Sequence, residues 1–245
     1  MRTESRHMEK KPVGDNIYTG NADWSFGGNV AKTFDSHVSR SVPLYDEGHQ
    51  LIAQVSDFLL QDQSVCYDLG CSTGSLIQRL NQRVGNRRVR FIGVDCEEPM
   101  IDKARERCEN LPNVSLVCSD LMDLEFEKAD LIICYYTMQF VRARNRQLLF
   151  SRIYEALNWG GGFLLFEKVR APDARFQDMM SAIYTDFKIE QGYSNEEIVA
   201  KSRSLKGVLD PFSTQGNLDL IKRAGFVDCM TILKYVCFEG FLAIK

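Results

Sequence analysis

Two acidic residues, each at the end of an apolar run, flank a glycine-rich turn in the first half of the chain. The first run ends at Asp68, just before Gly70 and Gly74, and the second run ends at Asp95. The two glycines allow a tight turn that a ligand can approach, because glycine has no Cβ and tolerates positive φ. An acid placed roughly 20 residues past such a turn can accept hydrogen bonds from both hydroxyls of a ribose. The spacing therefore predicts a nucleoside site.

The form of this turn favours a cationic ligand. It reads D-x-G-x-x-x-G and lacks the middle glycine of the G-x-G-x-x-G turn, which lets a pyrophosphate approach. The carboxylate of Asp68 would also repel a phosphate. S-adenosyl-L-methionine (SAM) carries an ammonium, a sulfonium and a ribose, and it has no phosphate. Together with Asp95 and the Ser119-Asp120-Leu121 string that ends a third strand, the motif predicts SAM as the cofactor.

Composition limits the remaining possibilities. The chain has 245 residues, of which 44% are hydrophobic, so one sizeable core is expected. A net charge of −3 argues against a broad nucleic-acid footprint. No apolar run approaches the ~20 residues of a membrane span, and the N-terminus has no apolar signal core. We therefore expect a cytoplasmic protein with a flexible tail at 1–20 and a single domain at 21–245.

The eight cysteines give no metal-binding pattern. They form no C-x-x-C pair, and the three histidines do not cluster near them. Several lie within apolar runs, where a free cysteine behaves as a small hydrophobe. We expect structural thiols in a reducing compartment and no metal site. Cys71 lies in the ligand turn, where it would touch SAM.

Apolar runs alternate with helical patterns along the chain. Strands are expected at 64–68, 89–95, 114–118, 129–135 and 163–167, with helices at 75–83, 99–110 and 145–157. A turn is expected at 158–162, and a terminal helix (219–224) and hairpin (229–236, 240–244) follow. This alternation predicts an α/β, Rossmann-like fold with helices on both faces of a mostly parallel sheet. Five parallel strands followed by an antiparallel hairpin give the seven strands of class I SAM-dependent methyltransferases. A ligand should lie at the carboxyl ends of the first, second and fourth strands.

Two segments fall outside this alternation. Helices are expected within 21–60, before the first strand, and in a helical insertion at 172–209. The insertion carries an apolar stripe at helical spacing, made of Phe176, Met179, Met180, Ile183, Tyr184 and Phe187. The stripe covers either the core of its own domain, or the active-site edge as a cap or dimer surface.

Six strings of the chain resemble the carboxy-SAM synthase family, in matching order and spacing from Asp23 onward. They are 23–26 (DWSF), 40–45 (RSVPLY), 67–72 (YDLGCS), 137–140 (TMQF), 186–188 (DFK) and 192–194 (GYS). The resemblance implies a homodimer of class I methyltransferase fold that joins SAM to a carboxylate derived from prephenate and releases phenylpyruvate. The product, carboxy-SAM, would serve a partner enzyme that modifies the wobble uridine of transfer RNA.

The resemblance also implies roles for single residues. Asp95 would hold the ribose, Asp120 with Leu121 would face the adenine, and Tyr45 would reach the sulfonium carbon. With the residues of the turn and of the strand ends, the predicted cofactor site comprises Tyr45, Asp68, Gly70, Cys71, Ser72, Gly74, Asp95, Cys96, Met100, Asp120, Leu121 and Tyr135. The predicted catalytic residues are Tyr45, Tyr135 and Arg203.

The chain departs from the family at two positions. The family has an arginine, which pairs with the new carboxylate, where this chain has Ser202, and the nearest arginine is Arg203. One residue turns a helical side chain by about 100°, so Arg203 could replace the family arginine only after a local shift. The second departure is Tyr135, which replaces an asparagine at the end of the fourth strand and would reshape the floor beneath the sulfonium.

These departures leave three functions open. The first is a SAM-dependent methyltransferase acting on a small molecule, because ordinary SAM needs no carboxylate anchor. The fourth strand ends without the Asn/Asp-Pro-Pro-Tyr string of enzymes that methylate base amines, so no direct nucleic-acid contact is expected. The alternative is carboxy-SAM synthesis with Arg203 as the anchor. The third is a non-catalytic SAM-binding scaffold, because the sequence fixes no general base.

Overall fold

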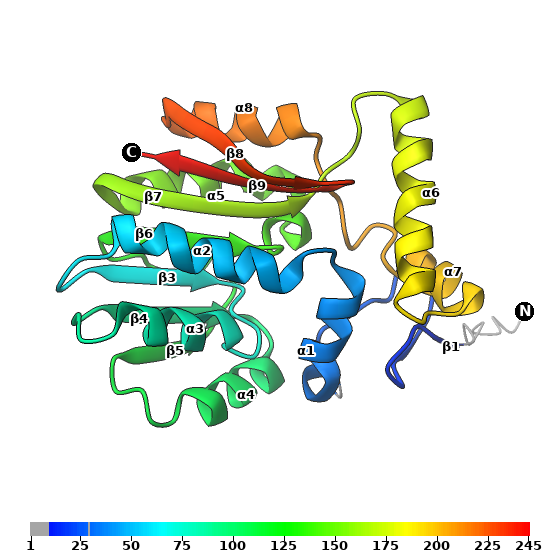
Figure 1. The fold of residues 1–245 in the computed structure, drawn as a ribbon, viewed down its shortest axis with the longest axis horizontal. Helices are drawn as coiled ribbons and strands as arrows, with labels where there is room; N and C mark the ends of the chain where they lie inside the picture. The colour runs from blue at the N-terminus through cyan, green and yellow to red at the C-terminus, as the bar shows by residue number, and fades with distance from the viewer. Residues whose placement is uncertain (1–9, 29) are drawn as a thin grey trace, which may run out of the picture.

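The computed structural model describes residues 10–28 and 30–245, and its centre is a seven-stranded sheet of order β5-β4-β3-β6-β7-β9-β8 (Figure 1). The strands are β3 (Val65–Leu69), β4 (Arg90–Asp95), β5 (Val114–Cys118), β6 (Ala129–Tyr135), β7 (Leu157–Lys168), β8 (Asp228–Tyr235) and β9 (Phe238–Ile244). Strands β3 to β7 pair in parallel, whereas β9 runs antiparallel to both β7 and β8. The predicted fold class is confirmed.

The composition of the central strands explains their place in the sheet. Strand β6 is apolar apart from Asp130, and its other residues are buried, as in a strand covered on both faces. Both β5 and β6 have the bounds that the sequence predicts. Strand β5 forms the edge of the sheet and is the most exposed of the parallel strands.

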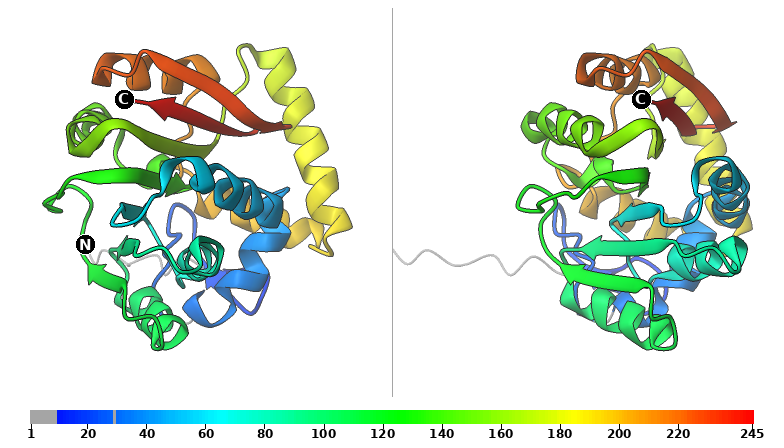
Figure 2. Two further views of the ribbon diagram at one scale, coloured as in Figure 1. Left: turned by 60° about the vertical axis from the view of Figure 1, so that its left-hand side comes forward. Right: turned by 90° about the vertical axis from the view of Figure 1, so that its left-hand side faces the viewer.

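Helices cover both faces of the sheet (Figure 2). Helices α2 (Tyr45–Leu59), α3 (Ser75–Val84) and α4 (Glu98–Cys108) lie on one face, and α5 (Ala143–Ala156) and α8 (Thr214–Ala224) lie on the other. Each face has its own apolar cluster, with Ile52 and Leu80 in one and Phe150 and Ile221 in the other. These two layers fix the strands and leave their carboxyl ends open for a site.

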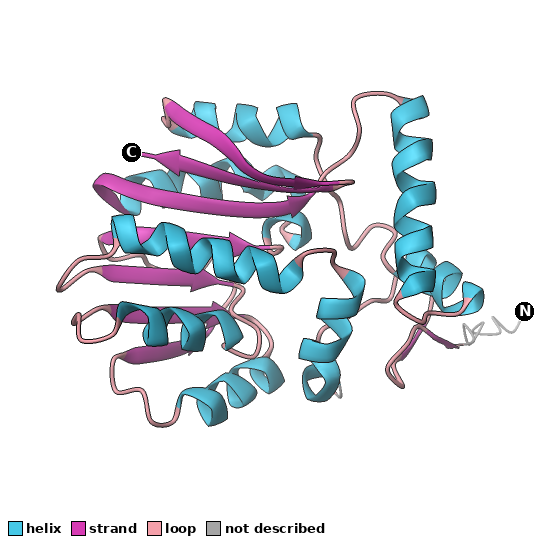
Figure 3. Ribbon diagram, in the orientation of Figure 1, coloured by secondary structure: helices cyan, strands magenta, loops and turns pink. Residues whose placement is uncertain are grey.

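The remaining elements lie beyond the carboxyl ends of the parallel strands, on the right in Figure 3. They are α1 (Val30–Ser41), α6 (Ala174–Glu190), α7 (Asn195–Ser204) and a hairpin of β1 (Lys11–Pro12) and β2 (Tyr18–Thr19). The apolar stripe of α6 is divided. Met180 and Tyr184 pack on the core, whereas the side chains of Phe176, Met179 and Ile183 are about half exposed.

Three local predictions were wrong. Residues 10–20 of the expected tail form the β1–β2 hairpin, in which Val13 is 1% exposed, and residues 1–9 lie outside the described part. The expected turn at 158–162 is a bulged part of β7, where backbone hydrogen bonds join Gly160 and Gly161 to Lys245. Helix α8 begins before residue 219, because Ser213 caps it by accepting from the N–H of Gly216.

Candidate functional site

The turn after β3 has the positive φ angles that its glycines predicted. Gly70 has a φ of 79° and donates its N–H to the carbonyl of Val94 at 2.7 Å. A Cβ on Gly70 would lie 2.3 Å from Oγ1 of Thr137, so no larger residue fits. Gly74 has a φ of 74° and begins α3. The turn therefore presents backbone to the carboxyl edge of the sheet, where a ligand can approach.

Asp95 is held in place by the turn and by its own loop. One carboxylate oxygen accepts from the N–H of Ser72 at 2.9 Å, and the other accepts from the N–H of Glu97 at 3.0 Å. Burial raises the pKa of Asp95, and these backbone donors act against that rise. Each carboxylate oxygen has a further lone pair, so the group can still accept two hydroxyl donors. This geometry suits the ribose role predicted for Asp95.

Asp68 is a buried carboxyl at the end of β3. Its side chain is 3% exposed, and burial together with the nearby charge of Asp95 raises its pKa to about 7. A ligand cation beside Asp68 would favour the ionised form and lower this pKa again. The position therefore suits the ammonium or sulfonium of SAM, as predicted.

An aromatic group stands where α2 begins. The ring of Tyr45 lies 4.7 Å from that of His49 and 5.0 Å from that of Tyr135, measured between centroids. The hydroxyl of Tyr135 donates to the backbone carbonyl of Tyr45 at 2.6 Å, and a Cβ on Gly48 would lie 2.2 Å from that hydroxyl. Tyr135 therefore fixes the start of α2 and places Tyr45 at the cavity.

A cavity of about 1080 Å³ lies at this carboxyl edge. It is lined by all but one of the predicted cofactor residues, namely Tyr45, Asp68, Gly70, Cys71, Ser72, Asp95, Cys96, Met100, Asp120, Leu121 and Tyr135. The exception is Gly74, which is not among the lining residues and which packs against Ala104. The lining shows that these residues share one site, and SAM binding by them stays a prediction.

The far end of the cavity, at β4 and β5, has a mixed character. Leu121 and Met100 are buried apolar residues, whereas Asp120 is exposed and accepts from the N–H of Met122 at 2.8 Å. A flat apolar wall beside a polar edge suits an adenine ring. The thiol of Cys71 lines the same cavity, but burial raises its pKa well above the ordinary value, so it is not poised as a nucleophile.

The predicted carboxylate anchor does not reach the cavity. Arg203 is exposed and is absent from the lining, whereas its neighbour Ser202 lines the cavity. The one-residue difference from the family therefore turns the guanidinium away from the site, as helix geometry requires.

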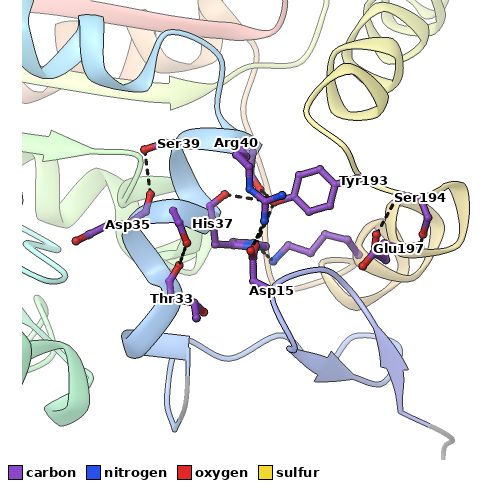
Figure 4. A network of polar contacts seen from close by, with 12 residues as sticks. Asp15, Thr33, Asp35, His37, Ser39, Arg40, Tyr193, Ser194 and Glu197 are labelled. Carbon is purple, nitrogen blue, oxygen red and sulfur yellow. Dashed lines mark hydrogen bonds and ion pairs between the residues drawn. The ribbon is translucent and has the colours of Figure 1, made fainter.

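A polar network joins the N-terminal segment, which lines the cavity through Val13, to α1 and to the start of α7 (Figure 4). Asp15 accepts from His37 at 2.6 Å and pairs with Arg40, and the hydroxyl of Tyr193 lies 3.3 Å from the same His37 nitrogen. The other ring nitrogen of His37 lies 3.2 Å from Nζ of Lys201. Burial and the charge of Lys201 lower the pKa of His37 to about 4. A neutral His37 thus donates to Asp15 and accepts from Lys201.

Three lysines of the lining escaped prediction. Lys168, Lys188 and Lys201 line the cavity from β7, α6 and α7, and burial lowers the pKa of each. Lys188 and Lys201 lie in charged, polar stretches of the sequence, which a helix on a solvated surface would also show. The insertion folds back over the strand ends and brings these two lysines inward, whereas Lys168 directly follows the expected fifth strand.

Residues 10–28 and 30–245 contain neither a candidate metal centre nor a candidate membrane span. No group of three or more histidine, cysteine, aspartate or glutamate side chains there could hold a metal ion. No helix in the same residues is both long and apolar enough to cross a membrane.

Comparisons with known proteins agree with this geometry. A family model described as "Methyltransferase domain" matches residues 66–161. Proteins named carboxy-S-adenosyl-L-methionine synthase are 33% identical in Staphylococcus epidermidis (91% of this chain, 97% of theirs) and 37% identical in Campylobacter lari (91% and 94%). The match therefore extends over almost the whole length of both chains.

Solved structures share the fold at low sequence identity. An O-methyltransferase family protein from Burkholderia thailandensis superposes with a TM-score of 0.63 at 14% identity, covering 88% of this chain and 59% of that one. The YcgJ protein from Bacillus subtilis gives 0.57 at 15% identity, covering 78% and 72%. At such identities the likeness shows the class I methyltransferase fold alone.

Proposed function

This chain belongs to the carboxy-S-adenosyl-L-methionine synthase family, and we propose from this premise that it converts SAM and prephenate into carboxy-SAM and phenylpyruvate. It is a SAM-dependent transferase by its domain and its relatives. Our first expectation from the sequence, methyl transfer to a small molecule, has less support than this alternative, because relatives matching over almost the whole chain carry the synthase name.

One observation supports the proposal most. The positions that the family resemblance assigns to the ligand, Tyr45, Gly70, Asp95, Asp120 and Leu121, line one cavity. Its volume of about 1080 Å³ is at the upper end of ligand pockets, which are commonly ~300–1,000 Å³. A synthase must hold SAM and a second substrate together, and a cavity of this size has room for both.

The residues present fit SAM from end to end. Asp95 offers two fixed carboxylate oxygens for the ribose hydroxyls. Asp68, which is buried and uncharged below about pH 7, becomes the counter-charge of the cationic end when it ionises. When bound, SAM supplies a methyl group whose carbon is acidified by the sulfonium. Tyr45 would stand beside that carbon, and its hydroxyl stays protonated because burial raises its pKa.

The net reaction balances without a further reactant. One C–H bond of the methyl group is replaced by a C–C bond to a carboxyl carbon. Prephenate loses that carboxylate and its ring hydroxyl, and it leaves as aromatic phenylpyruvate. The hydroxyl and the methyl proton leave together as water. The protein has to align the two substrates and exclude bulk water, which the aromatic group and the N-terminal segment can do.

The test is an assay of the purified protein with SAM and prephenate, read by mass spectrometry. We expect a product heavier than SAM by one carbon dioxide, together with an equal amount of phenylpyruvate. A reaction without prephenate, or one with S-adenosylhomocysteine in place of SAM, should give no carboxy-SAM. An Asp95→Ala variant should lose the reaction through weaker SAM binding. If phenylpyruvate and carboxy-SAM fail to form together, the proposed reaction is wrong.

One observation keeps methyl transfer as a second candidate. Ser202 stands where the family has its carboxylate-binding arginine, and Arg203 does not line the cavity. Formation of S-adenosylhomocysteine with a small-molecule acceptor, without carboxy-SAM, would favour it. Stoichiometric SAM binding without either turnover would instead favour a scaffold.

We also propose that two copies of the chain associate, as the family resemblance implies. In this proposal the exposed apolar side chains of Phe176, Met179 and Ile183 on α6 form the contact surface. A monomeric mass by light scattering would contradict this. Any link to transfer RNA would then run through a partner enzyme that uses carboxy-SAM.

A further inference from the structure

Two ammonium groups share one aromatic ring at the edge of the cavity. Nζ of Lys168 lies 4.3 Å from the ring centroid of Tyr184, and Nζ of Lys188 lies 4.5 Å from the same centroid. Lys188 follows Tyr184 by one helical turn on α6, whereas Lys168 comes from the end of β7. We call Lys168 and Lys188 the lysine pair. The ring attracts both cations but neutralises neither.

The lysine pair has no counter-charge in the part of the chain that the structure describes. Neither ammonium forms an ion pair with any described carboxylate. Lys201, in contrast, is connected to Asp15 through His37. Both lysines are partly withdrawn from water, and each lies in the cavity lining. Two such cations on one aromatic ring are unfavourable unless a bound anion compensates them.

The surroundings of the lysine pair suit a ring-bearing anion. The ring of Phe238 packs edge-on against Tyr184 at 5.2 Å and lies 5.9 Å from the ring of Tyr136. All three rings line the cavity. The hydroxyl of Tyr184 donates to the backbone carbonyl of Ser41 at 2.7 Å, which fixes the ring against α1. The site therefore combines aromatic walls with two cations on a fixed support.

The lysine pair is displaced from the predicted SAM position. Asp68 is the last but one residue of β3, and Lys168 ends β7, with β6 lying between these two strands. Adjacent strands are about 4.8 Å apart, so the two strand ends are separated by roughly 10 Å. Asp68 and Asp95 belong to β3 and β4, whereas Lys168 and Arg170 lie at and just beyond the end of β7 and Lys188 lies on α6. The cavity thus has carboxylates where a cationic ligand is expected and several cations near the end of β7.

We propose that the lysine pair, supported by Tyr184, binds a carboxylate of the second substrate and selects a ring-bearing dianion for this site. The inference rests on the proposed function for the identity of that substrate as prephenate. Lys168 and Lys188 are binding and specificity residues here, because they would touch the substrate. They also supply positive charge that Ser202 cannot.

The experiment compares Lys168→Met and Lys188→Met with the wild type. Methionine keeps most of the stem and removes the charge. Lys222→Met, an exposed position on α8, is the matched control for loss of one lysine. Calorimetry measures prephenate binding to protein loaded with S-adenosylhomocysteine, which has no methyl group to react. The same variants are then assayed for carboxy-SAM formation and for SAM affinity.

We expect each variant of the lysine pair to weaken prephenate binding and to raise its KM by roughly 10- to 100-fold, the cost of a lost charged hydrogen bond. The SAM affinity of each variant should stay within about threefold of the wild-type value, because the lysine pair lies apart from the predicted SAM position. Lys188→Arg should restore most of the affinity, and Lys222→Met should behave as wild type. Unchanged melting temperatures and SAM affinity would show that the variants are folded.

Two outcomes would overturn the inference. If SAM affinity falls in parallel with prephenate affinity, the ammoniums serve the carboxylate of SAM itself. If the variants bind prephenate as tightly as the wild type does, or if the wild type does not bind it, the lysine pair selects no such dianion. The proposed function fails separately: a wild type that binds prephenate in a lysine-dependent way but forms no carboxy-SAM would retain the binding site and refute the reaction.

Discussion

Asp68 should make the stability of the protein depend on pH in a way that one substitution removes. Burial and the charge of Asp95 raise the pKa of this carboxyl from 3.8 to about 7 in the folded state. The protonated form therefore stabilises the fold. That contribution is complete below about pH 4 and is lost as the pH rises to about 7. The shift corresponds to roughly 4 kcal/mol in total, or about 1.4 kcal/mol for each pH unit within this window.

The assay is urea unfolding of the wild type and Asp68→Asn between about pH 5 and about pH 8. Asparagine keeps the shape of the side chain and cannot ionise, so the variant should gain stability relative to the wild type by about 2–3 kcal/mol as the pH rises. Asp123→Asn changes an exposed carboxylate of the same cavity and is the matched control. Parallel loss of stability in wild type and Asp68→Asn across this range would refute the reasoning.

Ionisation of Asp68 should also control SAM binding, but SAM affinity should rise with pH where stability falls. A cationic ligand favours the ionised carboxylate, so the affinity of the wild type should rise with pH up to about 7 and then level off. The Asp68→Asn variant should bind SAM more weakly at pH ~8 and lack this dependence. Calorimetry at several pH values would also show proton release on binding to the wild type near pH ~7.

Three further substitutions have defined outcomes. Asp95→Ala should raise the Kd for SAM, measured by titration calorimetry, by about 10²- to 10⁴-fold. The variant loses the two charged hydrogen bonds expected from the ribose hydroxyls to the carboxylate that Ser72 and Glu97 hold in place, at ~1.5–3 kcal/mol each. Gly70→Ala should destabilise the fold by about 2–5 kcal/mol in urea unfolding, since φ is positive and Thr137 leaves no space. Tyr135→Phe should cost about 0.5–1.5 kcal/mol by removing the bond to Tyr45, and a kcat within a few-fold of wild type would mark Tyr135 as a positioning residue.

The central part of the fold follows from local patterns. Strands β5 and β6 have the predicted bounds, because each is a short, mostly apolar run with polar residues on either side. The ligand turn was predictable for a related reason. Positive φ at Gly70 and the acid at Asp95 are requirements of the local backbone and of the strand end, so they show in the sequence.

The N-terminal hairpin depends on contacts that are distant in sequence. Strands β1 and β2 have only two residues each, which is too few to show any periodicity. Asp15 finds partners in His37 and Arg40, and the hydroxyl of Tyr193 lies 3.5 Å from it. From the sequence alone, a polar N-terminal segment with mixed charge predicts a flexible tail, because these distant partners cannot be identified. The bulge in β7 could not be predicted either, because it depends on hydrogen bonds to Lys245, which is distant in sequence.

Overall charge gave no guidance on the lysine pair. The chain carries 33 acidic and 30 basic residues, yet one side of its cavity holds cations that no described carboxylate neutralises. Net charge describes association with extended surfaces such as nucleic acid. A pocket depends instead on a few side chains that folding separates from their neighbours in the sequence. A net negative charge that disfavours a nucleic-acid footprint is therefore compatible with an anionic small-molecule substrate.

The place of Arg203 shows why the charge must come from elsewhere. Its carbonyl accepts from the N–H of Ala22 at 3.0 Å and from that of Lys206 at 3.3 Å, while Ser204 accepts from Trp24. Rotating the end of α7 by about 100° to bring the guanidinium inward would break these bonds and release the N-terminal segment from the cavity. Because the backbone opposes that rotation, compensation for the missing family arginine is easier from side chains that already face the cavity. The lysine pair meets this condition, and it would supply the positive charge for an anionic substrate that Ser202 does not.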